Sequence, residues 1–252
     1  MTTFEYVSGE MVETNQNAPI LVADSFLVTE GKVRSLDKHI VRLINHTALK
    51  APELLPAIPD YIFQALSLVP RTGDHFPRLE IQTDNSLKIQ LRPVPELTET
   101  VVLWTYPEAD PRADLTVKGP ELDLGANIRD QALQQGADEA ILLTKEGHIS
   151  EGALSSLVWW EEDILTAPDN EIPWLESITR TEIFEIAEKL GIKTQTKKVK
   201  PLELIGKEVW SLSSLQGIRA VSSWVNLSDN FLPATQKLTF DRELEALLVP
   251  LP

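Results

Sequence analysis

The chain has 252 residues, 42% of them hydrophobic, and its 23 basic and 38 acidic side chains give a formal net charge of −15. This acidic charge argues against nucleic acid or anionic membranes as partners, and the absence of cysteine excludes disulfides, thiolate catalysis, cysteine-bound zinc and iron–sulfur clusters. No apolar run approaches the ~18 residues of a membrane span, and residues 1–16 lack the pattern of a signal peptide, so we expect a cytoplasmic protein.

The first part of the chain is predicted to mix strands with helices. Apolar residues recur at helical spacing over 40–47, which predicts a helix at 36–50 that ends at Ala51-Pro52. Asp84-Asn85 separates two alternating segments and indicates a two-residue hairpin turn. The elements expected here are strands at 20–28, 77–83 and 86–91, and helices at 36–50 and 59–68.

Pro93-Val94-Pro95 is the stiffest linker in the sequence and lacks two backbone donors, so we predict a domain boundary there. A smaller N-terminal α/β domain would cover 1–94, and a larger C-terminal domain, carrying most of the functional site, would cover 95–252. The elements expected in the second domain are helices at 123–135 and 179–190 and strands at 101–106, 140–144, 157–160, 164–166, 192–196, 209–212 and 220–225. Interleaved strands and helices, with hairpins as well as crossovers, predict an α+β (mixed α/β) fold.

The sequence contains none of the common catalytic signatures. There is no HExxH, Walker A, GxGxxG or GxSxG motif. His39 and His46 lie seven residues apart on one predicted helix face, where a structural role is favoured over metal binding. We therefore predict no metal site.

Two segments have the chemistry of an anion-binding site. Thr179 precedes Glu182 by three residues just before an apolar helical run, a capping-box pattern whose helix start can hold a phosphate. Ser213-Ser214 follows the predicted strand 209–212 and can also cradle an anion. Taken singly, an ordinary helix cap and an ordinary turn explain these segments equally well. Lys118, expected at a strand end, and Glu151 would by themselves be solvated charges.

Taken in order, these segments resemble the class IV aminotransferases, the fold type IV group of pyridoxal-phosphate enzymes. The resemblance implies a two-domain architecture like that of D-amino-acid aminotransferase, and a homodimer. The matching segments occur in the family's order and at about its spacing: Asp37–Leu43, Lys118-Gly119, Gly136–Leu143, Gly147–Ser156, Leu165–Pro168 with Ile178–Arg180, and Ser213–Ile218.

The resemblance also implies roles for individual residues around pyridoxal 5'-phosphate. Lys118 would form the Schiff base with the cofactor and shuttle the substrate's α-proton. Glu151 would keep the pyridine nitrogen protonated, so that the ring can accept electrons. Arg42 would bind the cofactor phosphate through its bidentate guanidinium. The helix start at Ile178 and Thr179 and the serine turn at Ser213 and Ser214 would bind the same phosphate.

The substrate side departs from the family pattern. Ala23 stands where an aromatic residue often faces the substrate, Glu176-Ser177 replaces the usual Pro-Gly, and Ser155-Ser156 replaces the usual Ser-Asn. The arginines that could bind a substrate carboxylate are Arg34, Arg92 and Arg219, of which Arg219 follows the serine turn most closely.

The expected function is a pyridoxal-phosphate-dependent aminotransferase that moves an amino group between an amino acid and a 2-keto acid. The alternative is 4-amino-4-deoxychorismate lyase, which eliminates pyruvate and 4-aminobenzoate with the same cofactor. Because both reactions use Lys118 and Glu151 alike, these residues do not distinguish them. A non-catalytic relative retained for binding is a third possibility, suggested by the altered N-terminal segment.

Overall fold

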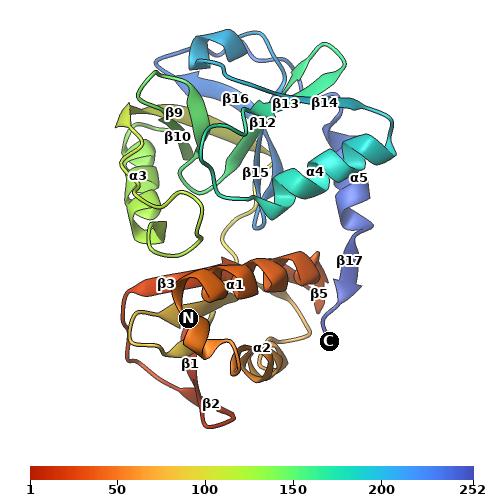
Figure 1. Cartoon of the computed structure of the whole chain (residues 1–252). Coiled ribbons are helices and arrows are strands. Elements are labelled where there is room, and N and C mark those ends of the chain that lie inside the picture. Colours follow the sequence, from red (N-terminus) through yellow and green to blue (C-terminus); the bar gives the residue numbers. More distant parts are fainter. The chain divides into compact units, whose positions relative to one another are not determined.

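The N-terminal residues form a five-stranded antiparallel sheet in the order β2-β1-β8-β7-β3, in a computed structural model that describes residues 1–252. Helices α1 and α2 pack against this sheet (Figure 1). The bounds are β1 (Thr2–Val7), β2 (Glu10–Glu13), β3 (Ile20–Ser25), β7 (Arg78–Gln82), β8 (Leu87–Leu91), α1 (Leu36–Lys50) and α2 (Ile58–Ser67).

The two faces of this sheet differ in polarity because successive side chains of a strand point to opposite sides. Val22, Leu79 and Ile89 belong to the apolar core that the helices share. On the other face, Ala23 lies opposite Glu80, and Glu80 lies opposite Lys88. Glu80 and Lys88 are nevertheless buried.

A four-stranded sheet, in the order β17-β5-β4-β6, brings the C-terminus back to the N-terminal residues. Its strands are β17 (Leu248–Pro250), β5 (Lys32–Arg34), β4 (Val28–Thr29) and β6 (Asp74–His75), and a short 3-10 helix, η1 (Pro52–Leu54), follows α1. The guanidinium of Arg71 donates a hydrogen bond of 2.6 Å to the carbonyl of Pro252. The first compact unit therefore comprises Met1–Leu97, Val117–Pro120 and Glu245–Pro252.

The second unit comprises Thr98–Thr116 and Glu121–Leu244 and is built on a mixed eight-stranded sheet. The strand order is β11-β10-β9-β16-β15-β12-β13-β14, and β9 runs parallel to both of its neighbours. The bounds are β9 (Thr100–Ala109), β10 (Glu139–Leu143), β11 (Ile149–Gly152), β12 (Ser156–Glu161), β13 (Ile164–Pro168), β14 (Lys193–Lys197), β15 (Val209–Ser213), β16 (Gly217–Val225), α3 (Leu122–Gln134), α4 (Ile178–Lys189), η2 (Pro201–Leu204) and α5 (Lys237–Glu245).

Tryptophans fill the interior of this second unit. Trp159 and Trp160 are neighbours on β12 and belong to two different apolar clusters, because they point to opposite faces of the sheet. Trp160 packs edge-to-face with Trp210, at 5.6 Å between ring centroids, in the cluster that α4 covers. Trp224 packs in the cluster of Trp159. These four side chains are core residues.

The mixed α/β class and the main elements agree with the sequence-based expectation. The predicted helix at 36–50 is α1, and the predicted hairpin around Asp84-Asn85 joins β7 to β8. Strands β1, β2 and β17 and helix α5 were not predicted, since they are short or lack a clear apolar period. None of the helices is long and apolar enough to cross a membrane.

The division of the chain into two units is not the single boundary at residue 94 that the sequence suggested. Residues 117–120 belong to the first unit, so Lys118 lies there and not in the C-terminal domain to which the sequence assigned it. The reason is packing, because the buried side chain of Val117 is part of the same apolar core as Val22 and Leu43. A boundary drawn along the sequence cannot describe a segment that returns to an earlier unit.

Candidate functional site

The backbone of Lys118 is tied to the first unit on both sides. The Ala23 N–H donates to the carbonyl of Lys118 at 2.8 Å, and the Lys118 N–H donates to Nδ1 of His46 at 3.2 Å. A Cβ on Gly119 would lie 2.4 Å from the carbonyl oxygen of Leu21, so only glycine permits this approach. Lys118 lies in an irregular segment and not at the end of a strand, as its sequence context had suggested. Its position is fixed by these contacts.

One face of α1 carries three buried polar residues, one of which contacts the backbone of Lys118. His39, Arg42 and His46 are all buried and lie three and four residues apart, which places them on the same side of the helix. His39 contacts Asp24 through Nδ1 at 2.7 Å, and His46 accepts the bond from Lys118. The two histidines thus have separate protein partners. Arg42 is one helical turn from the histidine that holds the lysine backbone.

The guanidinium of Arg42 makes a bidentate contact with Asp24. Nε donates to Oδ2 at 2.7 Å and Nη2 donates to Oδ1 at 2.8 Å. Although burial opposes ionisation, the charges of Arg42 and His39 hold the pKa of Asp24 well below its usual range. Asp24 occupies the Nε–Nη2 edge of the guanidinium, and phosphate binding by Arg42 stays a prediction. Any phosphate contact of Arg42 must use its other N–H groups.

Glu151 is a buried acidic residue of the second unit. It lies on β11 and is only 5% exposed. Oε1 accepts hydrogen bonds from Arg112 Nη2 at 2.8 Å and from the Leu175 N–H at 3.4 Å, whereas no hydrogen bond reaches Oε2. Burial raises the pKa of Glu151 to about 7, although Arg112 opposes this shift. A buried carboxylate therefore keeps one oxygen available for a further donor.

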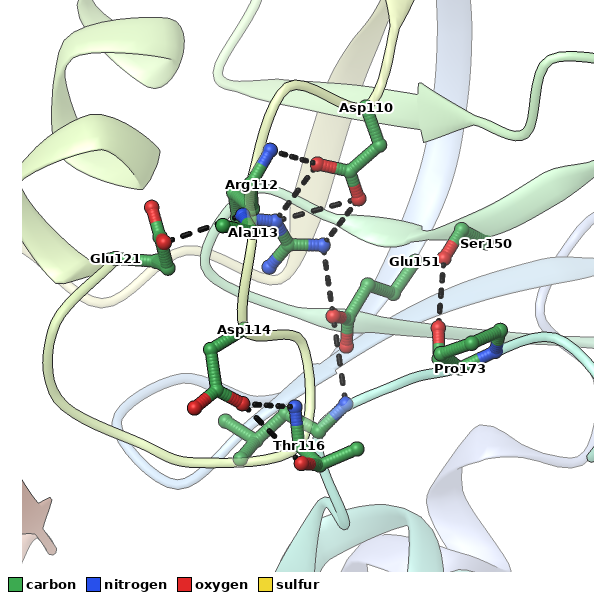
Figure 2. A network of polar contacts seen from close by, with 10 residues as sticks. Asp110, Arg112, Ala113, Asp114, Thr116, Glu121, Ser150, Glu151 and Pro173 are labelled. Atoms are coloured by element: carbon green, nitrogen blue, oxygen red, sulfur yellow. Dashed lines mark hydrogen bonds and ion pairs between the residues drawn. The ribbon is translucent and has the colours of Figure 1, made fainter. Parts of the chain in front are cut away.

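Arg112 and Asp110, which sequence reasoning missed, hold this carboxylate in place (Figure 2). Asp110 accepts from Arg112 Nη2 at 2.7 Å and from Nε at 3.0 Å. Burial lowers the pKa of Arg112, but Asp110 and Glu151 outweigh it and raise the pKa overall. The only sequence signal was two opposite charges spaced for a turn just before Lys118, because Glu151 is 39 residues further along the chain.

Helix α4 begins one residue earlier than its sequence pattern indicated. Ser177 is the N-cap, and its Oγ accepts a hydrogen bond from the Arg180 N–H at 3.2 Å. The predicted capping box of Thr179 and Glu182 is wrong, since Ile178 and Thr179 are the first helical residues and are buried. The positive end of the helix still lies at Ile178 and Thr179. Leu175 in the preceding loop links this helix start to Glu151.

Ser213 and Ser214 lie where the sequence placed them, at the end of β15 and in the turn to β16. The Oγ of Ser213 accepts from the Gln216 N–H at 3.0 Å, so this hydroxyl closes the turn. Helix α4 packs against β15 within the same unit. The second unit thus carries Glu151, the start of α4 and the serine turn on connected elements.

The three candidate arginines for a substrate carboxylate have different surroundings. Arg34 is half-buried on β5. Arg92 donates to the carbonyl of Phe76 at 3.1 Å and to Oγ of Ser25 at 3.0 Å. Arg219 is buried on β16 with no partner for Nε, and burial lowers its pKa while Glu139 opposes the shift. Arg34 and Arg92 lie in the first unit and Arg219 in the second, and their role stays a prediction.

Comparison with known proteins shows the family of the chain. The family model described as amino-transferase class IV matches residues 21–224. A probable branched-chain-amino-acid aminotransferase from Synechocystis sp. is 34% identical over 119 residues, which are 45% of this chain but only 38% of that relative. The chain therefore matches well under half of the length of this relative.

Two solved structures resemble the chain over nearly its whole length. The branched-chain aminotransferase of Thermoproteus uzoniensis with norvaline has a TM-score of 0.78 and 21% identity, covering 100% of both chains. A hypothetical aminotransferase from Mycobacterium tuberculosis, in a PLP-bound form, has a TM-score of 0.75 and 18% identity, covering 99% of both chains. With the family model matching most of the chain, the protein belongs to the class IV aminotransferase family.

Proposed function

We propose that the protein is a pyridoxal-phosphate-dependent aminotransferase that transfers an amino group between an amino acid and a 2-keto acid. The observation that carries this proposal is Glu151, a buried carboxylate with Oε1 held by Arg112 and no hydrogen bond at Oε2. An acceptor of this kind fits a protonated pyridine nitrogen, which needs one buried acidic partner. Family membership supports the same reading.

The residues present fit pyridoxal phosphate. When bound, this cofactor supplies an electron-accepting ring that stabilises the negative charge left by removal of an amino acid's α-proton. Glu151 would hold the proton on the ring nitrogen through Oε2. A cationic ring nitrogen beside this oxygen would favour the ionised carboxylate and so offset the effect of burial.

Lys118 would supply the amine that attaches the cofactor and then carries the α-proton. The backbone of Lys118 is held by hydrogen bonds to Ala23 and His46. The side chain therefore begins from a fixed position, which reduces the entropy lost when its amine is placed for reaction. Arg112 is only six residues before Lys118, and an extended chain rises ~3.3–3.6 Å per residue. The Cα atoms of Arg112 and Lys118 are therefore joined by at most ~22 Å of chain.

The phosphate would be bound by the start of α4 at Ile178 and Thr179, by the turn of Ser213 and Ser214, and by Arg42. A helix start offers oriented backbone N–H groups and a positive dipole end. Ser213 Oγ accepts the bond that closes its turn and still has an O–H to donate, so both serine hydroxyls can serve as donors. Arg42 would contribute mainly charge, since Asp24 occupies its bidentate edge.

The substrate's carboxylate would be bound by an arginine, for which Arg34, Arg92 and Arg219 are the candidates. Arg92 contacts Ser25, which lies on the same face of β3 as Ala23, the position that often faces the substrate in this family. This contact supports Arg92 over Arg219, whose guanidinium is buried beside Glu139. Replacing each arginine by methionine and measuring KM for the amino donor separates the three.

A substrate panel on the cofactor-loaded protein tests the function. We expect keto-acid formation from an amino acid only when a 2-keto acid acceptor is added. Pyruvate release from 4-amino-4-deoxychorismate without an acceptor would instead identify a lyase. A protein that stays colourless with added cofactor would indicate a non-catalytic relative.

We also propose that the protein is a homodimer acting on small amino and keto acids. The exposed apolar side chains of Val41 and Leu49 on α1 and of Phe63 on α2 support a covered surface in the first unit. Light scattering at several protein concentrations tests the oligomeric state, and a monomer at all of them would contradict the proposal.

A further inference from the structure

Three buried charges form a chain that ends on the functional carboxylate (Figure 2). The side chains of Asp110, Arg112 and Glu151 are 7%, 8% and 6% exposed. Arg112 uses Nη2 for both carboxylates, at 2.7 Å to Asp110 and 2.8 Å to Glu151. Asp110 also accepts from the backbone N–H of Arg112 at 3.1 Å, which fixes the turn between them.

This arrangement costs desolvation energy that a neutral core would avoid. Replacing a buried ion pair by apolar residues is often neutral or stabilising, so such a pair is weak evidence for a role in stability alone. The geometry of these three residues fixes the orientation of the Glu151 carboxylate. Because Oε1 is bound by Arg112 and by the Leu175 N–H, the carboxylate cannot rotate freely and Oε2 is left as the only oxygen open to another donor.

We propose that Arg112 is a positioning residue for Glu151, whose carboxylate it turns so that Oε2 meets the cofactor ring. Asp110 acts one step further away by holding the guanidinium of Arg112. This inference rests on the function proposed above. Arg112 itself does not touch the reacting atoms.

The charged groups around Glu151 support this assignment. Arg112 and Asp110 face it from the segment after β9, and Arg180 acts on it electrostatically from α4. The guanidinium of Arg180 stacks 3.9 Å over the ring of Trp174 and donates to the Pro168 carbonyl and to Asn170, not to Glu151. Arg112 is therefore the one cation in direct contact with the carboxylate.

The first experiment measures the carboxyl titration of Glu151 by carbon-13 NMR in the cofactor-free protein, with Glu151→Gln to assign the signal. We expect Arg112→Met to raise the titration midpoint by at least about one pH unit, since a tenfold loss of stabilisation of the anion corresponds to one unit. Arg112→Lys should restore part of the shift because it keeps the charge but loses the fork. The matched control is Arg129→Met, which removes a half-buried arginine of the same unit that donates to the Asp138 carbonyl.

The second experiment measures pyridoxal-phosphate affinity and steady-state kinetics of the same variants. We expect Arg112→Met to weaken cofactor binding roughly tenfold and to lower kcat more than KM, with a smaller effect for Asp110→Asn. Arg129→Met should leave both near wild type. If Arg112→Met does not fold, Arg112→Lys and Asp110→Asn carry the same comparison with smaller perturbations.

The outcomes separate this inference from the proposed function. A wild-type protein that transaminates, with unchanged Glu151 titration and kinetics in Arg112→Met, overturns the role of Arg112 and leaves the aminotransferase intact. A wild-type protein that neither binds the cofactor nor transaminates overturns the proposed function. In that case the NMR titration alone still shows whether Arg112 lowers the titration midpoint of Glu151.

Discussion

Asp24 binds Arg42 through both carboxylate oxygens, at 2.7 Å to Nε and 2.8 Å to Nη2, and both side chains are buried. The pair joins β3 to α1 in the unit that carries Lys118. It also reduces the net positive charge that Arg42 presents to an anion. The arginine of the sequence motif is thus held by its own chain before it meets any ligand.

The Asp24→Asn variant should be strongly destabilised. Removing the carboxylate leaves the buried guanidinium of Arg42 unpaired, which costs about 3–5 kcal/mol. Urea unfolding followed by circular dichroism measures this loss. Asp37→Asn, an exposed carboxylate in the first turn of the same helix, should change the free energy of unfolding by less than about 1 kcal/mol. Equal effects of the two substitutions would refute the structural role of the pair.

The Gly119→Ala variant should displace the lysine backbone. Its Cβ would lie 2.4 Å from the Leu21 carbonyl oxygen, and relieving such overpacking typically costs about 1–3 kcal/mol. We expect weaker pyridoxal-phosphate binding as well as lower stability, measured by absorbance titration and thermal unfolding. Gly9→Ala is the control, because its φ of +93° makes alanine strained in the turn between β1 and β2, where an added Cβ would meet no other atom. Cofactor affinity that falls equally in both variants would count against a local effect.

Glu151 should make the cofactor-free protein less stable as the pH rises. Its pKa is raised by burial from 4.5 to about 7, so between these values the folded protein keeps a proton that the unfolded chain has released. Raising the pH across this window therefore destabilises the fold by about 3 kcal/mol. Urea unfolding at pH 5 and pH 8 should show this slope in the wild type and lose it in Glu151→Gln.

Glu161 gives the free energy of unfolding a pH dependence of the opposite sign, at lower pH. Burial raises its pKa, but hydrogen bonds from Lys207 and Lys197 outweigh this and lower it to about 2. Its contribution to stability is present at pH values above the ordinary pKa and is lost as the pH falls from about 4.5 towards 2.

A pH dependence of Glu151→Gln identical to that of the wild type would show that Glu151 is not protonated in the folded protein at neutral pH.

The Lys118→Ala variant should lose transamination and the absorbance of the lysine-bound cofactor. No other group can replace an amine that both attaches the cofactor and moves the α-proton. Lys189→Ala removes an exposed lysine paired with Glu243 and should retain activity. Turnover by Lys118→Ala at the wild-type rate would remove this residue from the mechanism.

Much of the fold was predictable from local patterns. The period of α1 at 36–50 and the turn at Asp84-Asn85 follow directly from backbone geometry, which repeats over a few residues. The start of α4 was misplaced, because Ser177 and Thr179 are both good caps and only the observed bond from the Arg180 N–H to Ser177 separates them. Short strands such as β17 lack enough residues to show a period.

The sequence by itself determined the family, through the order of its motifs, and the absence of any cysteine chemistry, because both are properties of the linear chain. Tertiary structure alone decided the partners of the charged groups. It joined Arg112 to Glu151 across 39 residues, turned the fork of Arg42 onto Asp24, and returned Lys118 to the first unit. These pairings depend on which buried charges meet when the chain folds. A buried charge without a partner costs several kcal/mol of desolvation energy, so each buried charge is paired with one that folding brings next to it.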